Sequence, residues 1–321
     1  MAKKPLRVGI VMDPIESITP YKDSSLAMLL EAERREAEIH YFNQADLKIV
    51  SGTALGRSRR LNVEDSRSNW WRFGEEQEIA LGELDVILMR KDPPFDMEYI
   101  YTTYILDRAK QAGALIMNDP EALRNMNEKA YTAWFPDCVP ATLITRSMDE
   151  MRAFLAEHGH AVIKPLGGMG GRSIFVIRQG DKNANVVFET LTDYGRQFAM
   201  AQTYIPEISL GDKRILLFDG EPVPYALARI PSDEDNRGNL VMGAVGKGQP
   251  LSDRDREICA RVGPALRDGG VIFAGIDVIG DYLTEVNVTS PTGMREIDEQ
   301  FDLNTAGLMF DAIERRLGRN G

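Results

Sequence analysis

The sequence predicts a parallel-sheet α/β domain followed by a larger α+β region built mainly from antiparallel strands. Three short, almost continuously apolar runs, at 6–12, 85–89 and 115–117, are separated by stretches with helical spacing, which is typical of a buried parallel sheet. From about residue 124 the strand-like runs lie closer together. There, Asp219-Gly220 and Gly280-Asp281 stand between apolar flanks and indicate hairpins.

The first region alternates strands with helices. The run 6–12 precedes an amphipathic helix at 24–36, and the run 85–89 precedes a helix near 98–110. Strands separated by helices imply a parallel sheet that is covered on both faces. The stretch 44–83 is polar and shows no clear period, so we expect an irregular insertion there.

The second region is predicted to be dominated by strands. We expect them at 161–164, 173–177, 198–205, 214–218, 225–230, 271–279 and 283–288. The segment 231–250 is rich in glycine and charge, lacks a period, and is longer than most structureless loops in compact domains. We expect this segment to be a functional cover or a disordered stretch.

Composition and charge exclude several classes of protein. With 38 lysines and arginines against 49 aspartates and glutamates, the 321-residue chain has a formal net charge of −11. This balance argues against a nucleic acid or an anionic membrane surface as the main partner. Cys138 and Cys259 lack the spacing of a disulfide framework or a zinc cluster. No apolar run approaches the about 18 residues of a membrane span, so we expect a cytoplasmic enzyme.

A glycine-rich loop at 166–173 follows the strand that ends in Lys164-Pro165. The loop fails the dinucleotide-binding fingerprint, because the third glycine is absent and a strand follows where a helix is required. Backbone N–H groups in such a loop can approach phosphate oxygens closely, since no Cβ intervenes. A flexible hairpin would explain the glycines as well, and the adjacent lysine favours the phosphate-binding interpretation.

The strongest chemical signal is the acidic run that holds Asp277, Glu285 and Asn287. Residues two apart in a strand share a face, so Glu285 and Asn287 point together. With an odd-numbered turn Asp277 lies opposite Glu285, whereas a two-residue turn would put Thr284 there. Two carboxylates and an amide oxygen are hard ligands that suit Mg²⁺. The alternative is the solvated face of an edge hairpin.

Two arginines flank the predicted hairpin turn at Asp219-Gly220. With a two-residue loop, Arg214 pairs with Tyr225, and Arg214 and Arg229 then face the same way. Two guanidinium groups on one face with no acid between them repel each other unless an anion binds there. The alternative is a pair of surface arginines on a solvated sheet.

Together these features resemble the ATP-grasp ligases. The order is a lysine, a second lysine before a glycine-rich loop, an arginine hairpin, a glycine-rich segment and the D…E-x-N run. Within these ligases, the chain resembles the bacterial glutathione synthetase family from about residue 6 to residue 317. The strings that carry the resemblance are IVMDP at 10–14, MRKDPPFD at 89–96, NEK at 127–129, GMGG at 168–171, GDKR at 211–214, LARIP at 227–231 and TEVNVTSPTG at 284–293.

The resemblance implies an N-terminal α/β domain at 1–123 and a two-part ATP-grasp domain at 124–321. The latter would include a lid at about 134–204 and a mobile loop at about 231–248. The implied reaction joins γ-glutamylcysteine to glycine through an acyl phosphate, with ATP as co-substrate and Mg²⁺, or Mn²⁺, as cofactor. Members of the family commonly form homo-oligomers, so the resemblance also implies a dimer or a tetramer.

By the same resemblance, individual residues receive roles. Those expected to bind the nucleotide are Lys129, Lys164, Gly168, Met169, Gly170, Gly171, Gln202, Tyr204, Ile205 and Asp212, the last toward the ribose. Those expected to hold the metal are Asp277, Glu285 and Asn287, while Arg214 and Arg229 would face the transferred phosphoryl group. Those expected to bind substrate are Arg90, Asn287, Ser290 and Thr292.

Three other functions remain to be compared with this one. Another ATP-grasp ligase, acting on amino acids or peptides, would share the motifs. A nucleotide-binding regulatory module need not keep the complete set of lysines, arginines and acids. An NAD-dependent dehydrogenase is disfavoured by the failed fingerprint. The chain also departs from the family pattern at 241–245, where bulky Val241 and Met242 replace the small residues that we expect.

Overall fold

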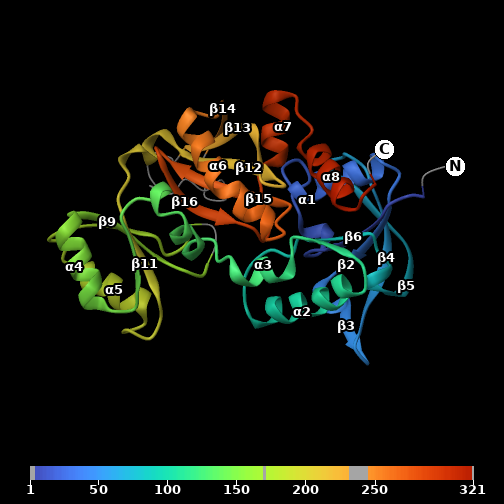
Figure 1. The fold of residues 1–321 in the computed structure, drawn as a ribbon, viewed down its shortest axis with the longest axis horizontal. Helices are drawn as coiled ribbons and strands as arrows, with labels where there is room; N and C mark the ends of the chain where they lie inside the picture. The colour runs from blue at the N-terminus through green and yellow to red at the C-terminus, as the bar shows by residue number, and fades with distance from the viewer. Residues whose placement is uncertain (1–3, 169–170, 231–244, 320–321) are drawn as a thin grey trace.

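The computed structural model describes residues 4–168, 171–230 and 245–319. Its strands form a seven-stranded, a four-stranded and a five-stranded sheet. Figure 1 shows the four-stranded sheet set apart at the left, while the other two sheets make up the rest of the molecule. None of the helices in these residues is both long and apolar enough to cross a lipid bilayer.

The seven-stranded sheet contains the predicted parallel strands. The elements are β1 (Arg7–Val11), η1 (Ile15–Ser17), α1 (Ser24–Arg34), β2 (Glu38–Phe42), β6 (Val86–Met89), α2 (Met97–Gln111), β7 (Leu115–Met117) and α3 (Pro120–Asn125). Strands β2, β1, β6 and β7 are neighbours in this order and run parallel. Helix α1 packs on the face that holds Ile10, and α2 packs on the face that holds Val11. The prediction of a parallel sheet covered on both faces is therefore confirmed.

The expectation of an irregular insertion at 44–83 is wrong. This stretch forms η2 (Gln44–Asp46), β3 (Leu47–Val50), β4 (Thr53–Val63), β5 (Trp71–Ala80) and η3 (Leu81–Glu83). Its strands extend the sheet antiparallel beyond β2. On β4, Arg57 lies opposite Glu78 and Arg59 lies opposite Glu76. These cross-strand charges cover the outer face and hide the two-residue apolar period in the sequence.

The four-stranded sheet is antiparallel and has its own core. Its elements are η4 (Ala130–Trp134) and η5 (Pro136–Cys138) at the entrance, then β8 (Thr142–Thr145), α4 (Met148–His158), β9 (His160–Pro165), β10 (Phe175–Arg178), α5 (Ala184–Thr192) and β11 (Ala199–Thr203). The strand order is β10-β9-β11-β8. Phe154 of α4 and Phe188 of α5 pack on Ile163 in a cluster separate from the rest of the core. We propose this unit, at about 134–204, as the lid.

The five-stranded sheet is also antiparallel, in the order β14-β13-β12-β15-β16. Its elements are η6 (Pro206–Leu210), β12 (Asp212–Phe218), β13 (Glu221–Ile230), β14 (Val245–Pro250), α6 (Asp253–Asp268), β15 (Phe273–Ile279), β16 (Tyr282–Asn287), α7 (Met294–Phe301) and α8 (Thr305–Arg316). Helix α6 covers the face that holds Ile215, and α7 and α8 cover the face that holds Leu216. The predicted antiparallel second region is confirmed.

The predicted loop at 231–250 is wrong in its last part, because residues 245–250 form the edge strand β14. Residues 231–244 lie outside the described residues. Glycine is unfavourable in a strand, but here packing against α7 requires it. A Cβ on Gly248 would lie 2.3 Å from Phe301 Cε2, and the Gly248 N–H donates to Gln300 Oε1 at 2.6 Å.

Asn118 joins the first sheet to the five-stranded sheet. Its Oδ1 accepts hydrogen bonds from the N–H groups of Ile272 and Phe273, both at 2.9 Å. Its Nδ2 donates to the carbonyl oxygens of Phe273 at 2.6 Å and Val288 at 2.7 Å. The buried amide therefore has all its hydrogen bonds made, and it fixes the ends of the two sheets next to each other.

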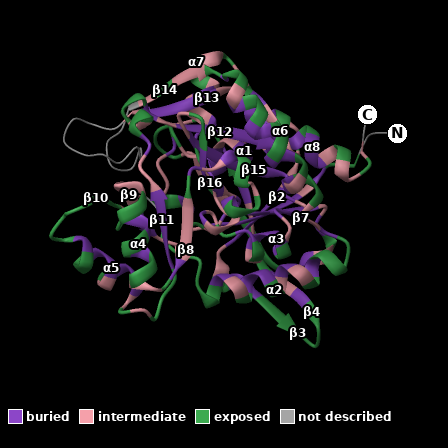
Figure 2. Ribbon diagram, turned by 60° about the vertical axis from the view of Figure 1, so that its left-hand side comes forward, coloured by how far each residue is buried: buried purple, intermediate pink, exposed green. Residues whose placement is uncertain are grey.

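Burial follows the layers. Figure 2 shows β12, β13, β15 and β16 of the five-stranded sheet, and also β2 and β7, as mainly buried, whereas the edge strand β3 is mostly exposed. Two apolar clusters each combine side chains from the first sheet with side chains from the five-stranded sheet. These two sheets consequently share one packed body, and the lid stands outside it.

A buried histidine predicts how this body responds to acid. His40 Nδ1 lies 2.7 Å from Ser58 Oγ, and its Nε2 lies 3.0 Å from Glu38 Oε1. Burial, with Arg7 adding to it, lowers the pKa of His40 from 6.5 to about 4. Between these two values the unfolded chain binds a proton that the folded chain does not. The free energy of unfolding should therefore fall as the pH drops through this range, by up to about 3 kcal/mol.

Urea unfolding across this pH range measures the effect. The His40→Asn chain should be less stable at neutral pH but should lose less stability on acidification than the wild type. Equal losses in the two chains would contradict the assignment to His40.

Candidate active site

A cavity of about 340 Å³ lies between the lid and the five-stranded sheet. Strands β9, β10 and β11 line one side, and β12, β13, β15 and β16 line the other. Residues 92–93, 128–129 and the turn 289–292 complete the wall. The cavity therefore draws on parts of the chain that are far apart in the sequence.

Part of the cavity wall is apolar. The side chains concerned are Val162, Ile174, Val176, Tyr204, Ile205, Ile208 and Ile279. Of Gln202, Tyr204 and Ile205, which are predicted to bind the nucleotide, the last two belong to this apolar wall. Gln202 lies beside them and donates to Thr142 Oγ1 at 3.0 Å. A mainly apolar wall with few polar groups suits a flat heterocyclic ring.

Asp277 on β15 is the centre of the charged part. Its oxygens accept from Arg214 Nε at 2.5 Å and from Arg214 Nη2 at 2.9 Å. Arg229 Nη2 lies 2.9 Å from Asp277 Oδ2. Although burial raises the pKa of Asp277, the two guanidinium groups outweigh burial and hold this pKa well below its usual range. Asp277 is thus a carboxylate that both arginines share.

The strand register brings Asp277 opposite Glu285 by an unpredicted route. The turn holds only residues 280–281, which by itself would place Thr284 opposite Asp277. A β-bulge at Thr284 restores the pairing, so the two carboxylates face each other across the ladder. The Thr284 hydroxyl donates to the Asp277 carbonyl oxygen at 3.1 Å.

The predicted pairing of Arg214 with Tyr225 is wrong, because an irregularity in β13 pairs Arg214 with Leu227 instead. The shift is of two residues, so Arg214 and Arg229 still share a face. The expectation that no acid lies between them is also wrong, since Asp277 contacts both. Asp277 belongs to β15 on the far side of β12, and no pattern within the hairpin reveals it.

Gly275, two residues before Asp277, leaves room for Arg214. A Cβ at this position would lie 2.8 Å from Arg214 Cδ and 3.0 Å from Pro291 Cβ. Arg214 Nη1 donates onward to the Thr292 carbonyl oxygen at 3.4 Å. The guanidinium group is therefore held between Asp277 and the turn 289–292.

Lys129 belongs to the segment before the lid, and its ammonium group lies close to Glu128 and Glu285. Its Nζ forms an ion pair with Glu128, lies 3.7 Å from Glu285 Oε1, and donates to the Gly168 carbonyl oxygen at 3.0 Å. Burial alone would lower the pKa of Lys129, but Glu285 and Glu128 outweigh burial and raise it. The ammonium group is thus kept charged.

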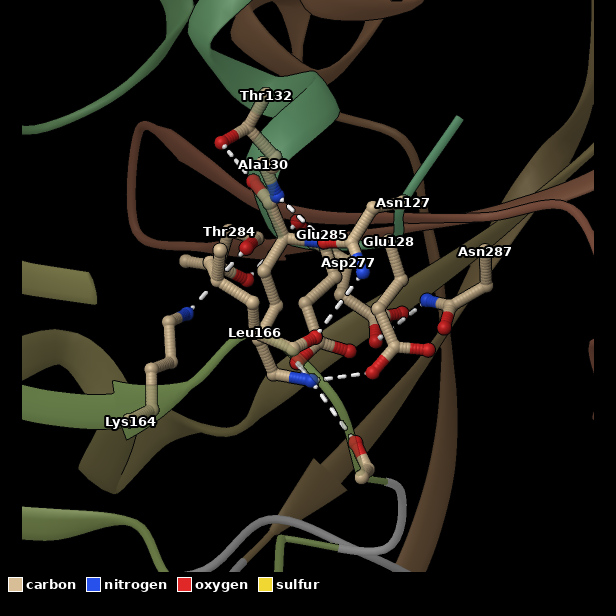
Figure 3. A network of polar contacts seen from close by, with 12 residues as sticks. Asn127, Glu128, Ala130, Thr132, Lys164, Leu166, Asp277, Thr284, Glu285 and Asn287 are labelled. Atoms are coloured by element: carbon tan, nitrogen blue, oxygen red, sulfur yellow. Dashed lines mark hydrogen bonds and ion pairs between the residues drawn. The ribbon is translucent and has the colours of Figure 1, made fainter. Parts of the chain in front are cut away.

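Lys164 approaches from the lid, and Figure 3 shows its side chain reaching toward Thr284. Its Nζ donates to the Thr284 carbonyl oxygen at 3.4 Å. Burial lowers the pKa of Lys164, although Glu285 opposes this shift. Gly168 and Gly171 also line the cavity, while residues 169–170, which include the predicted Met169 and Gly170, lie outside the described residues.

Asp212 belongs to the same charged group. Arg229 Nη2 donates to its Oδ2 at 2.5 Å. Burial raises the pKa of Asp212 to about 7, and Asp277 and Glu285 add to the shift against the opposing charge of Arg229. Its predicted position near a ribose stays a prediction.

Of the residues expected to bind substrate, Ser290, Thr292 and Asn287 line the cavity, but Arg90 is not part of its wall. Arg90 is buried behind the turn 289–292. Its Nη2 donates to the Pro291 carbonyl oxygen at 3.1 Å, and its Nε donates to Ser25 Oγ at 3.0 Å. The structure therefore shows Arg90 supporting the turn from outside the cavity.

The cavity wall also holds residues that the sequence patterns did not predict. Glu128 and Asp92 line the cavity, as do the apolar side chains of Ile174 and Val176. Glu128 directly precedes Lys129 in the NEK string. An acid next to a predicted phosphate-binding lysine is the sequence feature that could have indicated it. The apolar residues had no signal beyond ordinary strand composition.

The predicted metal ligands fit a divalent cation. Asn287 Nδ2 donates to Asp277 Oδ2 at 3.3 Å, which leaves the amide oxygen for another partner. The Glu285 side chain is 22% exposed toward the cavity. Within the described residues, no three histidine, cysteine or acidic side chains form a metal-binding group by themselves. The set is therefore made of oxygen donors and needs the amide of Asn287, which suits Mg²⁺ or Mn²⁺.

Comparison with known proteins shows the family of the chain. The model of the prokaryotic glutathione synthetase N-terminal domain matches residues 6–124, and that of the prokaryotic glutathione synthetase ATP-grasp domain matches residues 128–302. The chain belongs to the prokaryotic glutathione synthetase family. The glutathione synthetase of Salmonella typhimurium is 55% identical over 314 residues, which are 98% of this chain and 100% of the relative. That of Vibrio parahaemolyticus is 54% identical over 312 residues, 97% of this chain and 99% of the relative.

Solved structures with the same fold have much less similar sequences. A D-cycloserine synthetase superposes with a TM-score of 0.68 at 14% identity, covering 97% of this chain and 99% of that chain. An ATP-grasp ligase in complex with a minimal precursor superposes with a TM-score of 0.64 at 18% identity, with coverage of 97% and 99%. The predicted ATP-grasp fold is confirmed.

The position of Asp277 between two arginines predicts the effect of removing its charge. Asp277→Asn leaves Arg214 and Arg229 buried and close together without their shared anion. Breaking a buried ion pair from one side typically costs about 3–5 kcal/mol, so we expect a loss of this size in the free energy of unfolding, measured in urea. Glu285→Gln is the matched control, because the partly exposed Glu285 should contribute less than about 1 kcal/mol. Similar losses in the two variants would contradict the central role of Asp277.

Proposed function

We propose that this chain joins γ-glutamylcysteine to glycine in an ATP-dependent ligation that releases ADP and phosphate. The observation that supports this most is the cavity between the lid and the five-stranded sheet, which combines an apolar wall with lysines, arginines and an oxygen-rich set. This combination suits a nucleotide whose base lies on the apolar wall and whose phosphates lie in the charged part. Membership in the glutathione synthetase family supports the choice of substrates.

Nucleotide binding would use the two sides of the cavity together. We assign the base to the wall that holds Tyr204 and Ile205, with Gln202 as a polar partner at its edge. Lys129 and Lys164 would bind the phosphates, since both ammonium groups are buried next to the cavity. Asp212 would stand close to the nucleotide on the side of Arg229.

The chemistry requires activation of a carboxylate. A carboxylate is a poor acyl donor, but its phosphorylation by ATP gives an acyl phosphate, whose phosphate leaves when the glycine amine attacks. Arg214 and Arg229 would stabilise the charge on the transferred phosphoryl group, and Asp277 already holds both in place before substrate arrives. No protein nucleophile is needed in this scheme, and Cys138 and Cys259 are both buried outside the cavity wall.

A divalent cation would complete the site. We propose Mg²⁺, with Mn²⁺ as a substitute, held by Asp277, Glu285 and Asn287. When bound, such a cation neutralises phosphate oxygens during transfer. The hydroxyl groups of Ser290 and Thr292 and the amide of Asn287 would bind substrate carboxylates on the same side. Arg90 would act indirectly, by holding the turn that carries these hydroxyls.

We further propose that the enzyme works in the cytoplasm as a homo-oligomer of two or four chains. The cytoplasm supplies ATP and keeps the cysteine thiol of the substrate reduced. Helix α2 exposes Met97, Tyr101 and Tyr104 at helical spacing, an apolar surface that a second copy would cover.

The direct test is ADP release by the purified protein with MgATP. We expect release with γ-glutamylcysteine and glycine together, and glutathione as the product. Omitting glycine should suppress most ADP release, because the acyl phosphate then has no acceptor. A panel of other acyl donors and amino acids tests the alternative ligases. Faster turnover with an unrelated pair, or no turnover with any pair, would contradict the proposal.

The cation site can be tested separately. Glu285→Gln removes a charged oxygen donor but keeps the size of the side chain. We expect the Mg²⁺ concentration for half-maximal activity to rise by about tenfold or more. Glu157→Gln on α4, an exposed position that is not part of the cavity wall, is the control. An unchanged Mg²⁺ dependence in the Glu285→Gln chain would remove Glu285 from the ligand set.

A further inference from the structure

Glu128 is a cavity carboxylate to which the proposed reaction gives no role. Its backbone oxygen accepts a hydrogen bond from Val286 N at 2.7 Å, which places Glu128 beside β16 between Glu285 and Asn287. Its side chain is 20% exposed and lines the cavity. Figure 3 shows the carboxylates of Glu128, Glu285 and Asp277 gathered in one region.

Lys129 is the cation that holds this region together. Its side chain is only 4% exposed, and its ammonium group is shared between Glu128 and Glu285. Asn127 fixes the segment, because its Oδ1 accepts a hydrogen bond from the Lys129 N–H at 3.1 Å. Burial raises the pKa of Glu128, and the charge of Glu285 raises it further, while Lys129 opposes both. In this structure the two glutamates therefore depend on one ammonium group.

The formal charges of the cavity wall cancel. Among the described residues that line it, five are acidic and five are basic, namely Asp92, Glu128, Asp212, Asp277 and Glu285 against Lys129, Lys164, Arg172, Arg214 and Arg229. A wall with as many acidic as basic side chains gives little attraction to a polyphosphate that arrives without cations. A polyphosphate that pairs with the ammonium group of Lys129 also leaves the carboxylates of Glu128 and Glu285 without the cation that they share.

From this arrangement we propose that Glu128 makes the site select metal-bound nucleotide over free nucleotide. When a phosphate pairs with the ammonium group of Lys129, the largely buried carboxylate of Glu128 loses its counter-ion. A divalent cation that enters with the nucleotide replaces the lost positive charge, and free nucleotide does not. Glu128 thereby weakens the binding of nucleotide that carries no divalent cation. The inference rests on the proposed nucleotide site and adds a specificity-determining residue to it.

Calorimetric titration tests this without turnover. The probe is the non-hydrolysable ATP analogue AMP-PNP, titrated into the full chain once with excess Mg²⁺ and once with EDTA. The measured quantity is the affinity for AMP-PNP with Mg²⁺ divided by the affinity for AMP-PNP in EDTA. We expect Glu128→Gln to lower this ratio by about tenfold or more, mainly because AMP-PNP in EDTA binds more tightly.

Two further variants serve as controls. Glu128→Asp keeps the charge and should give a ratio closer to the wild type than Glu128→Gln does. Asp92→Asn removes the same charge from an exposed part of the cavity wall and should leave the ratio near the wild-type value. Circular dichroism of each variant confirms that it is folded.

The outcomes separate the inference from the proposed function. An unchanged ratio in Glu128→Gln, with normal binding by the wild type, would overturn the role of Glu128 alone. An equal decrease in Asp92→Asn would also overturn it, because the effect would then come from net charge and not from the partner of Lys129. If the wild type binds AMP-PNP in neither condition, the proposed nucleotide site itself is wrong.

Discussion

The shared ion pair between Asp277 and the two arginines is the interaction on which the site depends. Arg214 and Arg229 are both buried and line the cavity, where two positive groups would repel each other strongly. Asp277 lies within 2.9 Å of both and keeps them in place. The same residue faces Glu285 across the ladder and accepts from Asn287. One buried carboxylate therefore orders the basic and the acidic parts of the cavity, and a nucleotide would meet groups that are already arranged.

Much of the fold could be predicted because it follows from local apolar patterns. The parallel strands are buried on both faces and appear in the sequence as continuous apolar runs such as 85–89. The hairpin at Asp219-Gly220 could also be predicted, because Asp-Gly between apolar flanks is typical of a tight turn with positive φ angles. The structure has φ angles of 53° and 84° at these residues. The stretch 44–83 could not, because cross-strand pairs such as Arg57 and Glu78 give one face of β4 and β5 the composition of a loop.

The motifs contain most of the residues that the structure brings to one cavity, but the geometry of that cavity depends on tertiary contacts. Asp277 and Glu285 come together only through the bulge at Thr284, and a bulge has no reliable sequence signal. Arg90 carries the right charge for a substrate carboxylate, yet the chain folds its guanidinium group behind the turn 289–292. Glu128 is placed beside Glu285 by a backbone hydrogen bond from Val286, more than a hundred residues away in the sequence, and only the folded chain reveals this contact.

The separate core of the lid has a consequence for the stability of the whole enzyme. Contacts across the boundary include the polar bonds from Asn127 to Leu166 and from Lys129 to Gly168, while the apolar cluster of the lid stays on its own side. For a unit with its own core, we expect local unfolding to cost less free energy than unfolding of the whole chain. A nucleotide that contacts both sides of the proposed site would add its binding free energy to the stability of the lid. Nucleotide in the proposed site would then protect the lid against heat and against proteases.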